Sequence, residues 1–470
     1  MVHAPETVSY SSARGRGVLL ASVLGSSMAF LDSTAVNVAL HSLGEELGTG
    51  LSGLQWTVDA YLLALGALVL TGGALGDAFG QRRIFLTGLG AFAVTSGLCG
   101  IATSVGLLAA ARAAQGLGAA LLVPTSLALL RTSFSEEDRD RAVAAWAGLS
   151  GVSTAMGPLL GGWLIGVWSW RAVFFLNLPL ALLAAWAGRR FVPTIEPGRS
   201  VREFDGGGVL SVTLGLGGIV FALIEGPVQG WSILSVASGL GGVLALGLFV
   251  LLQARGGHPM LPLGLFRSRA FRGANLTTLA VYFALGGATF FIVLALQQEV
   301  GYSPLEAGAS LLPITVLMLL LSPFVGGLAQ RLGSRVLMLI GPLVCAVGLA
   351  LFTRIERGGS YVDSVLPGAV GLGLGLALTV GPLTATVLDS VAGSQAGIAS
   401  GFNNAVARIA GLLAVALLPG VCGLTGRVGA GFLAGVHRAL WLSAALCAVG
   451  GVCAWVLIPG GKHGDASRPR

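Results

Sequence analysis

Long apolar runs alternate with short polar, glycine-rich or proline-containing connections along the whole chain. An α-helix rises 1.5 Å per residue, so about 20 apolar residues cross the ~30 Å hydrocarbon core of a bilayer. Fourteen runs are long enough to do so, and each predicts one membrane-spanning helix. The predicted spans are 18–39, 54–75, 84–103, 105–130, 142–165, 172–188, 209–225, 233–254, 273–297, 305–328, 336–354, 365–389, 400–421 and 434–458. The pattern therefore predicts an all-α polytopic membrane protein.

Composition supports the same class, and the charges indicate the orientation. Of the 470 residues, 54% are hydrophobic and 10% are charged, whereas soluble domains carry about 25% charged residues. Twenty basic residues lie in connections on the side of the N-terminus, and five lie in connections on the opposite side. By the positive-inside rule both termini are expected in the cytoplasm. The net charge of +7 is thus a topology signal and does not support nucleic-acid binding.

Residue patterns typical of enzymes and metalloproteins are missing from this sequence. The five cysteines show no CxxC spacing and the five histidines are scattered, so neither a disulfide framework nor a metal site is expected. The only lysine, Lys462, lies near the C-terminus, which excludes a GxxxxGK[ST] phosphate loop, and the GxSxG and HExxH motifs are absent. We therefore expect no enzyme and no cofactor, but a protein that moves material across the membrane.

Three charged side chains interrupt the predicted spans near the N-terminus. Asp32 lies in "FLDSTAVNVAL" of the first span, Asp59 in the second and Arg112 in the fourth, at similar depths. A charge near the bilayer centre costs about 2.5–3.5 kcal/mol, so such residues normally face the bundle interior and pair. We predict a proton-coupling cluster, because burial favours the neutral acid whereas a nearby guanidinium favours the carboxylate. The alternatives are a structural ion pair and, for Asp59, snorkelling or capping at the interface.

A short internal repeat suggests two related halves. "GALGDAFGQRR" (73–83) and "GGLAQRLGSRV" (326–336) each end one apolar span and lead into the next. Two halves of related topology are the plan expected of a secondary transporter, although chance similarity in glycine-rich sequence is an alternative. The aligned pairs are Gly73 with Gly326, Gly80 with Gly333, and Arg82 with Arg335.

Several motifs, in order along nearly the whole chain, resemble those of the major facilitator superfamily. "LDSTAVNVAL" is similar to the helix 1 motif of its drug:proton antiporters, "GALGDAFGQRR" to the loop 2–3 signature, "RAAQGLGAA" to the helix 4 motif and "GVSTAMGPLLGG" to the helix 5 antiporter motif. "WRAVFFLNLPL" and "LQQEVGYSPLEAGASLLP" resemble the fourteen-span branch typified by bacterial multidrug exporters. The chain departs from the pattern at His41, where a proline is usual, and at Gln81, where a basic residue is frequent.

The resemblance implies a major facilitator fold of two six-helix halves plus two linking helices. The implied segments are an N-terminal tail (1–17), a first half (18–190), linkers with two extra helices (191–272), a second half (273–458) and a C-terminal tail (459–470), with both tails cytoplasmic. It also implies a conformational latch and an antiporter motif. The latch residues are Gly73, Asp77, Gly80, Arg82 and Arg83, and the antiporter-motif residues are Gly151, Gly157, Pro158, Gly161 and Gly162. The alternatives are a solvated loop for Asp77 and ordinary small-residue helix packing for the glycines.

Polar and aromatic residues within the spans are candidates to line a substrate cavity. The six spans of the second half contain no acid near the midplane, whereas the ninth span carries aromatic side chains and ends in two glutamines. Such groups suit a neutral or weakly basic amphipath, although the aromatics could instead face lipid or pack between helices. The candidate cavity residues are Gln115, Asn177, Tyr282, Phe283, Phe290, Phe291, Gln297 and Asn403.

These observations predict proton-coupled efflux of small amphipathic drugs or antibiotics by alternating access. We expect a monomer in the bacterial cell membrane, whose partners are its substrate, protons and the lipid bilayer, with no nucleic acid. An exporter dedicated to one endogenous metabolite or lipid is the alternative within transport. A membrane sensor or channel-like protein is the alternative from another class.

Overall fold

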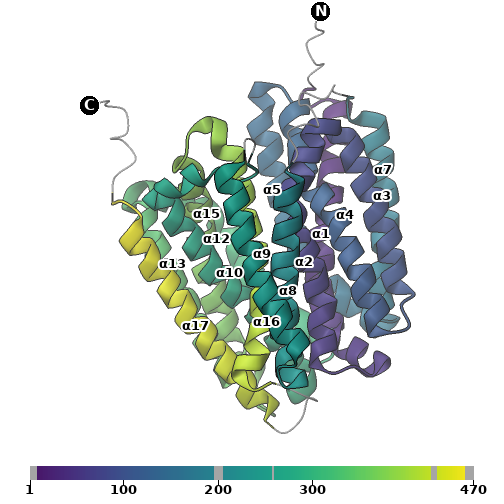
Figure 1. The fold of residues 1–470 in the computed structure, drawn as a ribbon, viewed down its shortest axis with the longest axis vertical. Helices are drawn as coiled ribbons and strands as arrows, with labels where there is room; N and C mark the ends of the chain where they lie inside the picture. The colour runs from purple at the N-terminus through teal and green to yellow at the C-terminus, as the bar shows by residue number, and fades with distance from the viewer. Residues whose placement is uncertain (1–7, 195–204, 257–258, 425–430, 461–470) are drawn as a thin grey trace, which may run out of the picture. The chain divides into compact units, whose positions relative to one another are not determined.

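The computed structural model of the chain describes residues 8–194, 205–256, 259–424 and 431–460 (Figure 1). Fourteen of its helical segments are long and apolar enough to cross a membrane. Within the described part of the chain there is no β-strand, and one isolated bridge pairs Val8 with Phe134. The all-α polytopic fold predicted from the apolar runs is therefore confirmed. The predicted tails and the linker after the sixth span lie partly outside the described residues.

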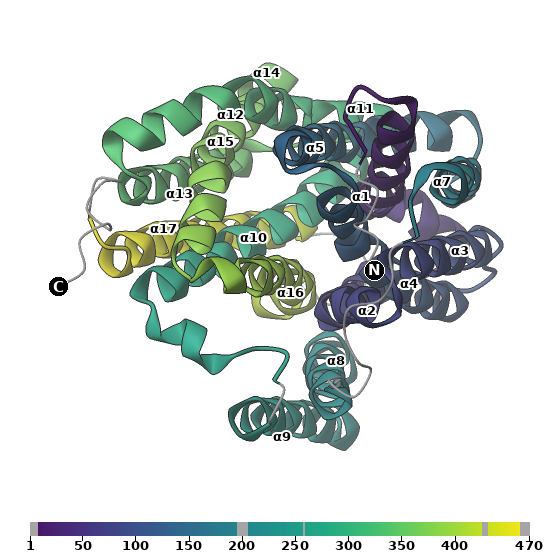
Figure 2. The ribbon, with the colours of Figure 1, turned by 90° about the horizontal axis from the view of Figure 1, so that it is seen from above.

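The chain forms two compact units, and seven helices belong wholly to the first. They are α1 (Ala13–Leu47), α2 (Leu51–Phe79), α3 (Gln81–Gly100), α4 (Val105–Ser133), α5 (Glu136–Val167), α6 (Arg171–Phe175) and α7 (Asn177–Phe191). In this unit α1 packs against both α5 and α7, and α4 packs against α2 and α3 (Figure 2). α1 therefore lies at the centre of its unit, in contact with helices from early and late in the sequence.

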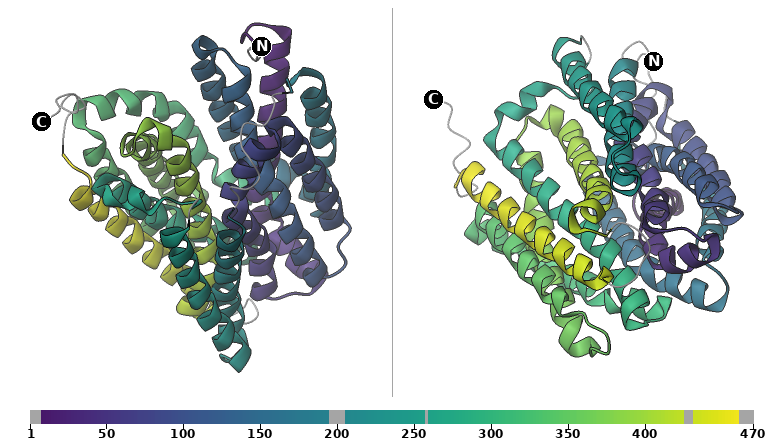
Figure 3. Two further views of the ribbon diagram at one scale, coloured as in Figure 1. Left: turned by 45° about the horizontal axis from the view of Figure 1, so that its top comes forward. Right: turned by 60° about the horizontal axis from the view of Figure 1, so that its bottom comes forward.

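The second unit contains the helices that follow residue 260. They are α10 (Arg269–Ala295), α11 (Pro304–Ser310), α12 (Leu312–Leu332), α13 (Ser334–Leu351), α14 (Tyr361–Ser364), α15 (Leu366–Asp389), α16 (Ala396–Cys422) and α17 (Phe432–Leu457), with shorter turns η2 (Leu263–Arg267), η3 (Leu296–Val300), η4 (Phe352–Arg354) and η5 (Gly393–Gln395). The last helix, α17, is yellow in Figure 3 and packs against α10 and α13. The two remaining helices, α8 (Gly206–Gln229) and α9 (Ile233–Arg255), each contribute residues to both units.

Some helix boundaries differ from the predicted spans, and proline explains three of the differences. The predicted sixth and tenth spans are each divided into a short and a long helix, and a short helix, α14, precedes the helix of the predicted twelfth span, α15. A proline just after each break has no backbone N–H to donate to the preceding turn, which interrupts the helical ladder. The breaks are at Leu176, Leu311 and Val365, and the prolines are Pro179, Pro313 and Pro367. The first helix differs in another way, because it continues through polar residues until Gly48 closes it in the left-handed conformation (φ 62°).

The aligned repeat has the same backbone geometry and the same kind of contact in both units. Gly80, between α2 and α3, has a φ of 93°, and Gly333, between α12 and α13, has a φ of 85°. Arg82 donates a hydrogen bond of 2.7 Å to the carbonyl of Arg189 near the end of α7. Arg335 donates one of 2.8 Å to the carbonyl of Trp455 near the end of α17. The arginine after the glycine turn is thus tied to α7 in the first unit and to α17 in the second.

Candidate functional site

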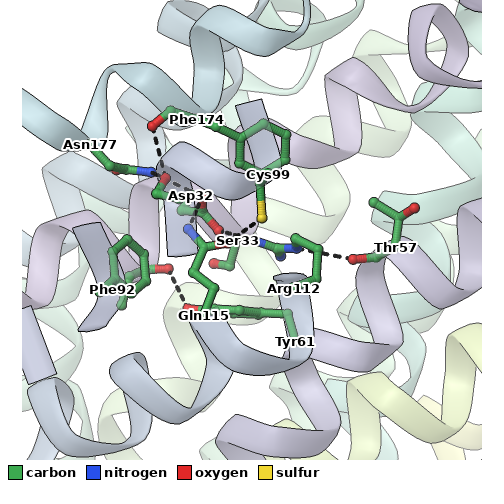
Figure 4. A network of polar contacts seen from close by, with 12 residues as sticks. Asp32, Ser33, Thr57, Tyr61, Phe92, Cys99, Arg112, Gln115, Phe174 and Asn177 are labelled. Atoms are coloured by element: carbon green, nitrogen blue, oxygen red, sulfur yellow. Dashed lines mark hydrogen bonds and ion pairs between the residues drawn. The ribbon is translucent and has the colours of Figure 1, made fainter. Parts of the chain in front are cut away.

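A buried polar cluster surrounds Asp32, in the interior of α1 (Figure 4). Arg112 of α4 forms an ion pair with one carboxylate oxygen, Oδ2. The side-chain amides of Gln115 and Asn177 donate hydrogen bonds of 3.0 and 3.1 Å to the other oxygen, Oδ1. All four side chains are buried. The carboxylate therefore has three donors from two other helices, and we call these four residues the Asp32 cluster.

The guanidinium of Arg112 is held on several sides. Its Nε donates to the backbone carbonyl of Thr57 on α2 at 3.1 Å, and its Nη1 donates to Oε1 of Gln115 at 2.7 Å. The ring of Tyr61 lies against it, with 4.2 Å from the guanidinium carbon to the ring centroid. A stacked, multiply bonded guanidinium cannot be replaced by the single ammonium of lysine without loss of contacts. Arg112 is thus fixed in position to meet the Asp32 carboxylate.

Local sequence explains how these side chains converge. Arg112 and Gln115 are three residues apart on α4, so they project from the same face of the helix. Asn177 is the first residue of α7, directly after the break at Leu176. Pro179 causes that break, and the amide of Asn177 reaches Asp32 from this new helix start. The helix break within the motif "WRAVFFLNLPL" therefore positions the side-chain amide of Asn177 next to Asp32.

An outer layer of polar groups supports the cluster. The amide of Asn177 also donates to the hydroxyl of Ser96 at 3.0 Å, and Ser96 donates in turn to the carbonyl of Phe174 at 2.8 Å. The thiol of Cys99 lies 3.6 Å from Oε1 of Gln115. Sequence reasoning missed both Ser96 and Cys99, because small polar residues in an apolar helix carry no signal of their partner.

Asp59 on α2 does not join the Asp32 cluster. Its side chain is fully buried, and neither of its carboxylate oxygens has a hydrogen-bond partner in the described part of the chain. Interface snorkelling or helix capping would require an exposed or hydrogen-bonded carboxylate, so both alternatives are wrong. An unpaired buried carboxylate is costly, whereas the protonated acid is tolerated. Asp59 is therefore a second, separate acid in the same unit.

Gln115 and Asn177 lie in the Asp32 cluster and not in the substrate cavity predicted for them. Gln115 and Asn177 were expected to line a substrate cavity, but both are buried and their amides contact Asp32. The reason is that the carboxylate needs donors in addition to Arg112, and these amides are within reach. We therefore assign both residues to the Asp32 cluster.

The glycines of the predicted antiporter motif lie on α5, next to the segment of α1 that contains Asp32. A side chain at Gly157 would collide with the hydroxyl of Thr34 and the carbonyl of Leu31, and one at Gly161 would lie 3.0 Å from the Ala35 side chain. By contrast, Gly151, one turn or more away, has open space. Pro158 is inside the helix and Gly162 is buried. The motif thus provides a smooth contact between α5 and α1.

The predicted latch residues surround the turn between α2 and α3. Asp77 is exposed and accepts a hydrogen bond of 2.8 Å from the Gln81 side chain. Arg82 donates to the hydroxyl of Thr194 at 2.6 Å, in addition to its contact with α7. Gly73 and Arg83 lie on α2 and α3, on either side of the Gly80 turn. These five residues therefore lie around one turn, where Asp77 has a local contact and Arg82 is bonded to residues more than 100 positions away.

The predicted cavity aromatics of α10 differ in exposure. Phe283, Phe290 and Phe291 are buried, and the rings of the last two meet edge to face with centroids 5.1 Å apart. These three therefore pack between helices and do not face lipid. Tyr282 is half-buried, and Gln297 lies in the η3 turn that continues α10.

Asn403 on α16 joins this helix to α10. Its amide donates hydrogen bonds of 3.1 Å to Oδ1 of Asn275 and 2.6 Å to the hydroxyl of Thr278. Arg408 lies five residues after Asn403, inside the predicted span 400–421, and sequence reasoning missed it. The same rule that singled out Arg112 could have found it, because an arginine inside an apolar run is a strong signal.

The sequence matches one protein family along most of its length. The profile of the Major Facilitator Superfamily matches residues 22–415. The chain is 36% identical over 405 residues to the multidrug resistance protein Stp of Mycobacterium tuberculosis, covering 86% of this chain and 75% of that protein. It is 35% identical over 412 residues to the tetracenomycin C resistance and export protein of Streptomyces glaucescens, covering 87% and 76%. It is 33% identical over 452 residues to the methylenomycin A resistance protein of Bacillus subtilis, covering 95% of each.

Solved structures show a likeness of fold. A POT family peptide transporter in an auto-inhibited form superimposes with a TM-score of 0.73 at 17% identity, covering 97% of this chain and 99% of that chain. The POT family transporter PepTSo gives a TM-score of 0.68 at 16% identity, covering 94% and 97%. At such low identity the likeness concerns the arrangement of helices alone.

Proposed function

Because the chain belongs to the major facilitator superfamily, we propose that it exports small amphipathic drugs or antibiotics across the cell membrane in exchange for protons. Relatives named for multidrug resistance, and for resistance to tetracenomycin C and methylenomycin A, support export of such compounds. The observation that carries the proton-coupling proposal is the buried ion pair between Asp32 and Arg112, with two amide donors on the same carboxylate.

The Asp32 cluster can couple a proton to movement of helices. Protonation removes the charge that Arg112, Gln115 and Asn177 stabilise, which weakens the contacts of α1 with α4 and α7. Arg112 keeps its bonds to Thr57 and Gln115 in the meantime, so the site remains organised. The glycine surface of α5 lets α1 shift without a steric barrier. Release of the proton on the other side of the membrane restores the ion pair.

The energy available from protons is sufficient for uphill export. Inward movement of one proton supplies about 2.3 kcal/mol per 100 mV and about 1.4 kcal/mol per pH unit. Asp59 serves as a second acid that stays protonated while it is buried. The turn around Asp77 and Arg82 acts as the conformational latch, which biases the equilibrium between states without contact to the substrate.

The proposed setting follows from the charges and from the relatives. Both termini lie in the cytoplasm of a bacterial cell, because the basic residues concentrate on that side. The working protein is a monomer of two six-helix halves (18–190 and 273–458), joined by the two extra helices. A dedicated exporter of one metabolite is the second candidate, and it is favoured by relatives whose names each refer to a single antibiotic.

The test uses everted membrane vesicles that contain the wild type or Asp32→Asn. The variant should lose proton-driven accumulation of an amphipathic antibiotic, because an amide cannot cycle between charged and neutral forms. It should still exchange labelled for unlabelled antibiotic without a gradient, which shows that the protein is folded. Glu137→Gln, at an exposed acid of α5, is the matched control and should behave as the wild type. Full proton-driven transport by Asp32→Asn would disprove the coupling role, and absence of any gradient-dependent transport by the wild type would disprove export.

A further inference from the structure

Arg408 lies near the middle of α16 (Ala396–Cys422), where a charge is most costly in a membrane. It is half-buried, and Asn404, four residues earlier, shares its helix face. Nothing in the proton cycle described above uses it. Intramembrane arginines normally face a bundle interior or a water-filled cavity and mark the path of a substrate or ion. Its position therefore makes Arg408 a candidate for recognition of a substrate or ion.

The described acids of the second unit do not lie at the depth of Arg408. Each of them is close to a helix end or in a connection, and several have local partners. Glu299 pairs with Arg357 at 2.7 Å, and Glu306 caps its own helix. The described acids are Glu225, Glu299, Glu306, Glu356, Asp363 and Asp389. This unit therefore carries a positive charge near the midplane and no described acid of its own at that depth.

Polar groups of α10 lie beside α16 in the same unit. Asn275, Thr278 and Tyr282 are spaced by three and four residues, so they occupy one face of α10. Asn403 binds the first two, which fixes this face against α16. Further along the same two helices, the backbone of Gly411 lies directly against Gly286. Arg408 lies between Asn403 and Gly411 on α16, and Tyr282 lies between Thr278 and Gly286 on α10, so the two residues are at the same level of two packed helices. Both side chains donate hydrogen bonds.

We propose that Arg408 and Tyr282 recognise an acidic group of the substrate, so that the exported compounds are amphipaths carrying a carboxylate or an acidic enol or phenol. This inference rests on the proposed export function and names its substrate class. The planar guanidinium binds a carboxylate through two parallel hydrogen bonds, which an uncharged group cannot match. Arg408 can have a partner in the substrate-free protein, because the acidic group of the substrate would replace that partner when it binds. This substrate class takes the place of the neutral or weakly basic amphipath, which was predicted from the absence of midplane acids and from the aromatic and amide groups of the ninth span, because that prediction did not consider the charge of Arg408.

Recognition of an anion also keeps the two tasks of the transporter apart. The proton binds Asp32, whose partner is Arg112 in the first unit, whereas the substrate acid binds Arg408 in the second. A cationic substrate would compete with the proton for the same acids. An anionic substrate does not, so loading of substrate leaves the Asp32 cluster free to titrate.

The experiment compares two fluorescent probes that differ in one acidic group, 1-pyrenebutyrate and its neutral methyl ester. Gradient-driven uptake into everted vesicles is measured for the wild type, Arg408→Gln, Arg408→Lys and the control Arg331→Gln, which removes an exposed arginine of α12. Protein-free vesicles correct for passive entry of the acid. The wild type and Arg331→Gln should show a KM for pyrenebutyrate at least tenfold below that for the ester. Arg408→Gln should raise the KM for the acid at least tenfold and that for the ester less than threefold, and Arg408→Lys should fall between.

The outcomes separate this inference from the proposed function. Equal losses for both probes in Arg408→Gln would overturn it and make Arg408 a structural or coupling residue. A wild-type preference for the ester would also overturn it, while proton-driven ester transport would leave the export function standing. Proton-driven uptake of neither probe, with uptake of other amphipaths intact, would show that acids are not the substrate class.

Discussion

Asn177 offers the cleanest way to change the Asp32 carboxylate without removing it. Its amide nitrogen donates to Oδ1 of Asp32 at 3.1 Å and to Ser96 at 3.0 Å, and its amide oxygen has no hydrogen-bond partner within the described residues. Leucine is similar in size and shape, so Asn177→Leu removes one donor and leaves the ion pair with Arg112 and the donor Gln115. Ser96 keeps its bond to the Phe174 carbonyl.

The size of the effect follows from the energy of the lost bond. A hydrogen bond to a charged group contributes about 1.5–3 kcal/mol, and a tenfold change in rate corresponds to about 1.36 kcal/mol. Loss of the donor weakens the contacts that hold the Asp32 carboxylate against α4 and α7. Proton-driven uptake should therefore fall by about ten- to a hundredfold.

The assay is the initial rate of proton-driven antibiotic uptake into everted vesicles, with the potential held constant. Ser96→Ala is the matched control, because it removes a hydroxyl of the outer layer but leaves the bond from Asn177 to Asp32; its rate should fall by less than about threefold. A wild-type rate in Asn177→Leu, or an equal loss in Ser96→Ala, would refute the idea that the amide donors hold the Asp32 carboxylate for coupling.

Two further predictions concern the neighbours of Asp32. Gly157→Ala should slow initial uptake at least tenfold with normal amounts of protein in the membrane, because the added methyl group would meet Thr34 and the Leu31 carbonyl. Gly151→Ala is the control and should leave the rate unchanged, because that position is open. Equal rates of initial uptake for the two variants would argue against the α5 surface as a sliding contact. Arg112→Lys should reduce the rate of proton-driven uptake at least tenfold, which corresponds to about 1.4 kcal/mol. The reason is that one ammonium cannot keep the bonds to Thr57, Gln115 and Asp32 and the stack on Tyr61. Wild-type uptake by this variant at every pH would contradict this reasoning.

The fold was predictable because a bilayer demands a simple pattern. A membrane-crossing helix needs about 20 apolar residues, and such runs can be recognised one at a time. Helix boundaries were less predictable, since polar residues do not stop a helix by themselves. The first helix passes through His41 and Glu45 before Gly48 ends it. A proline break such as that before Pro179 depends on which backbone hydrogen bonds of the helix are lost, and the hydrophobicity of the run does not show this.

The candidate site was predictable in its charges and not in its neutral groups. Asp32 and Arg112 could be paired from sequence because each is costly in the hydrocarbon core without the other. Gln115 and Asn177 could not be placed, because an amide suits a cavity wall and a buried carboxylate equally well. Tyr61 gave no signal of its stack on Arg112, since a tyrosine in a span is common.

The hydrogen bonds that tie the two glycine turns to α7 and to α17 have a consequence for biosynthesis. The acceptor for Arg82 lies 107 residues further along the chain, and the acceptor for Arg335 lies 120 residues further. At about 5–20 residues per second the ribosome needs roughly 5–20 s to deliver the first of these carbonyls after the arginine has emerged. During that interval the newly inserted helices α2 to α5 lack their closing contact. The contact that ties the first glycine turn therefore forms only after α7 has been made, and the contact that ties the second forms only after α17 has been made.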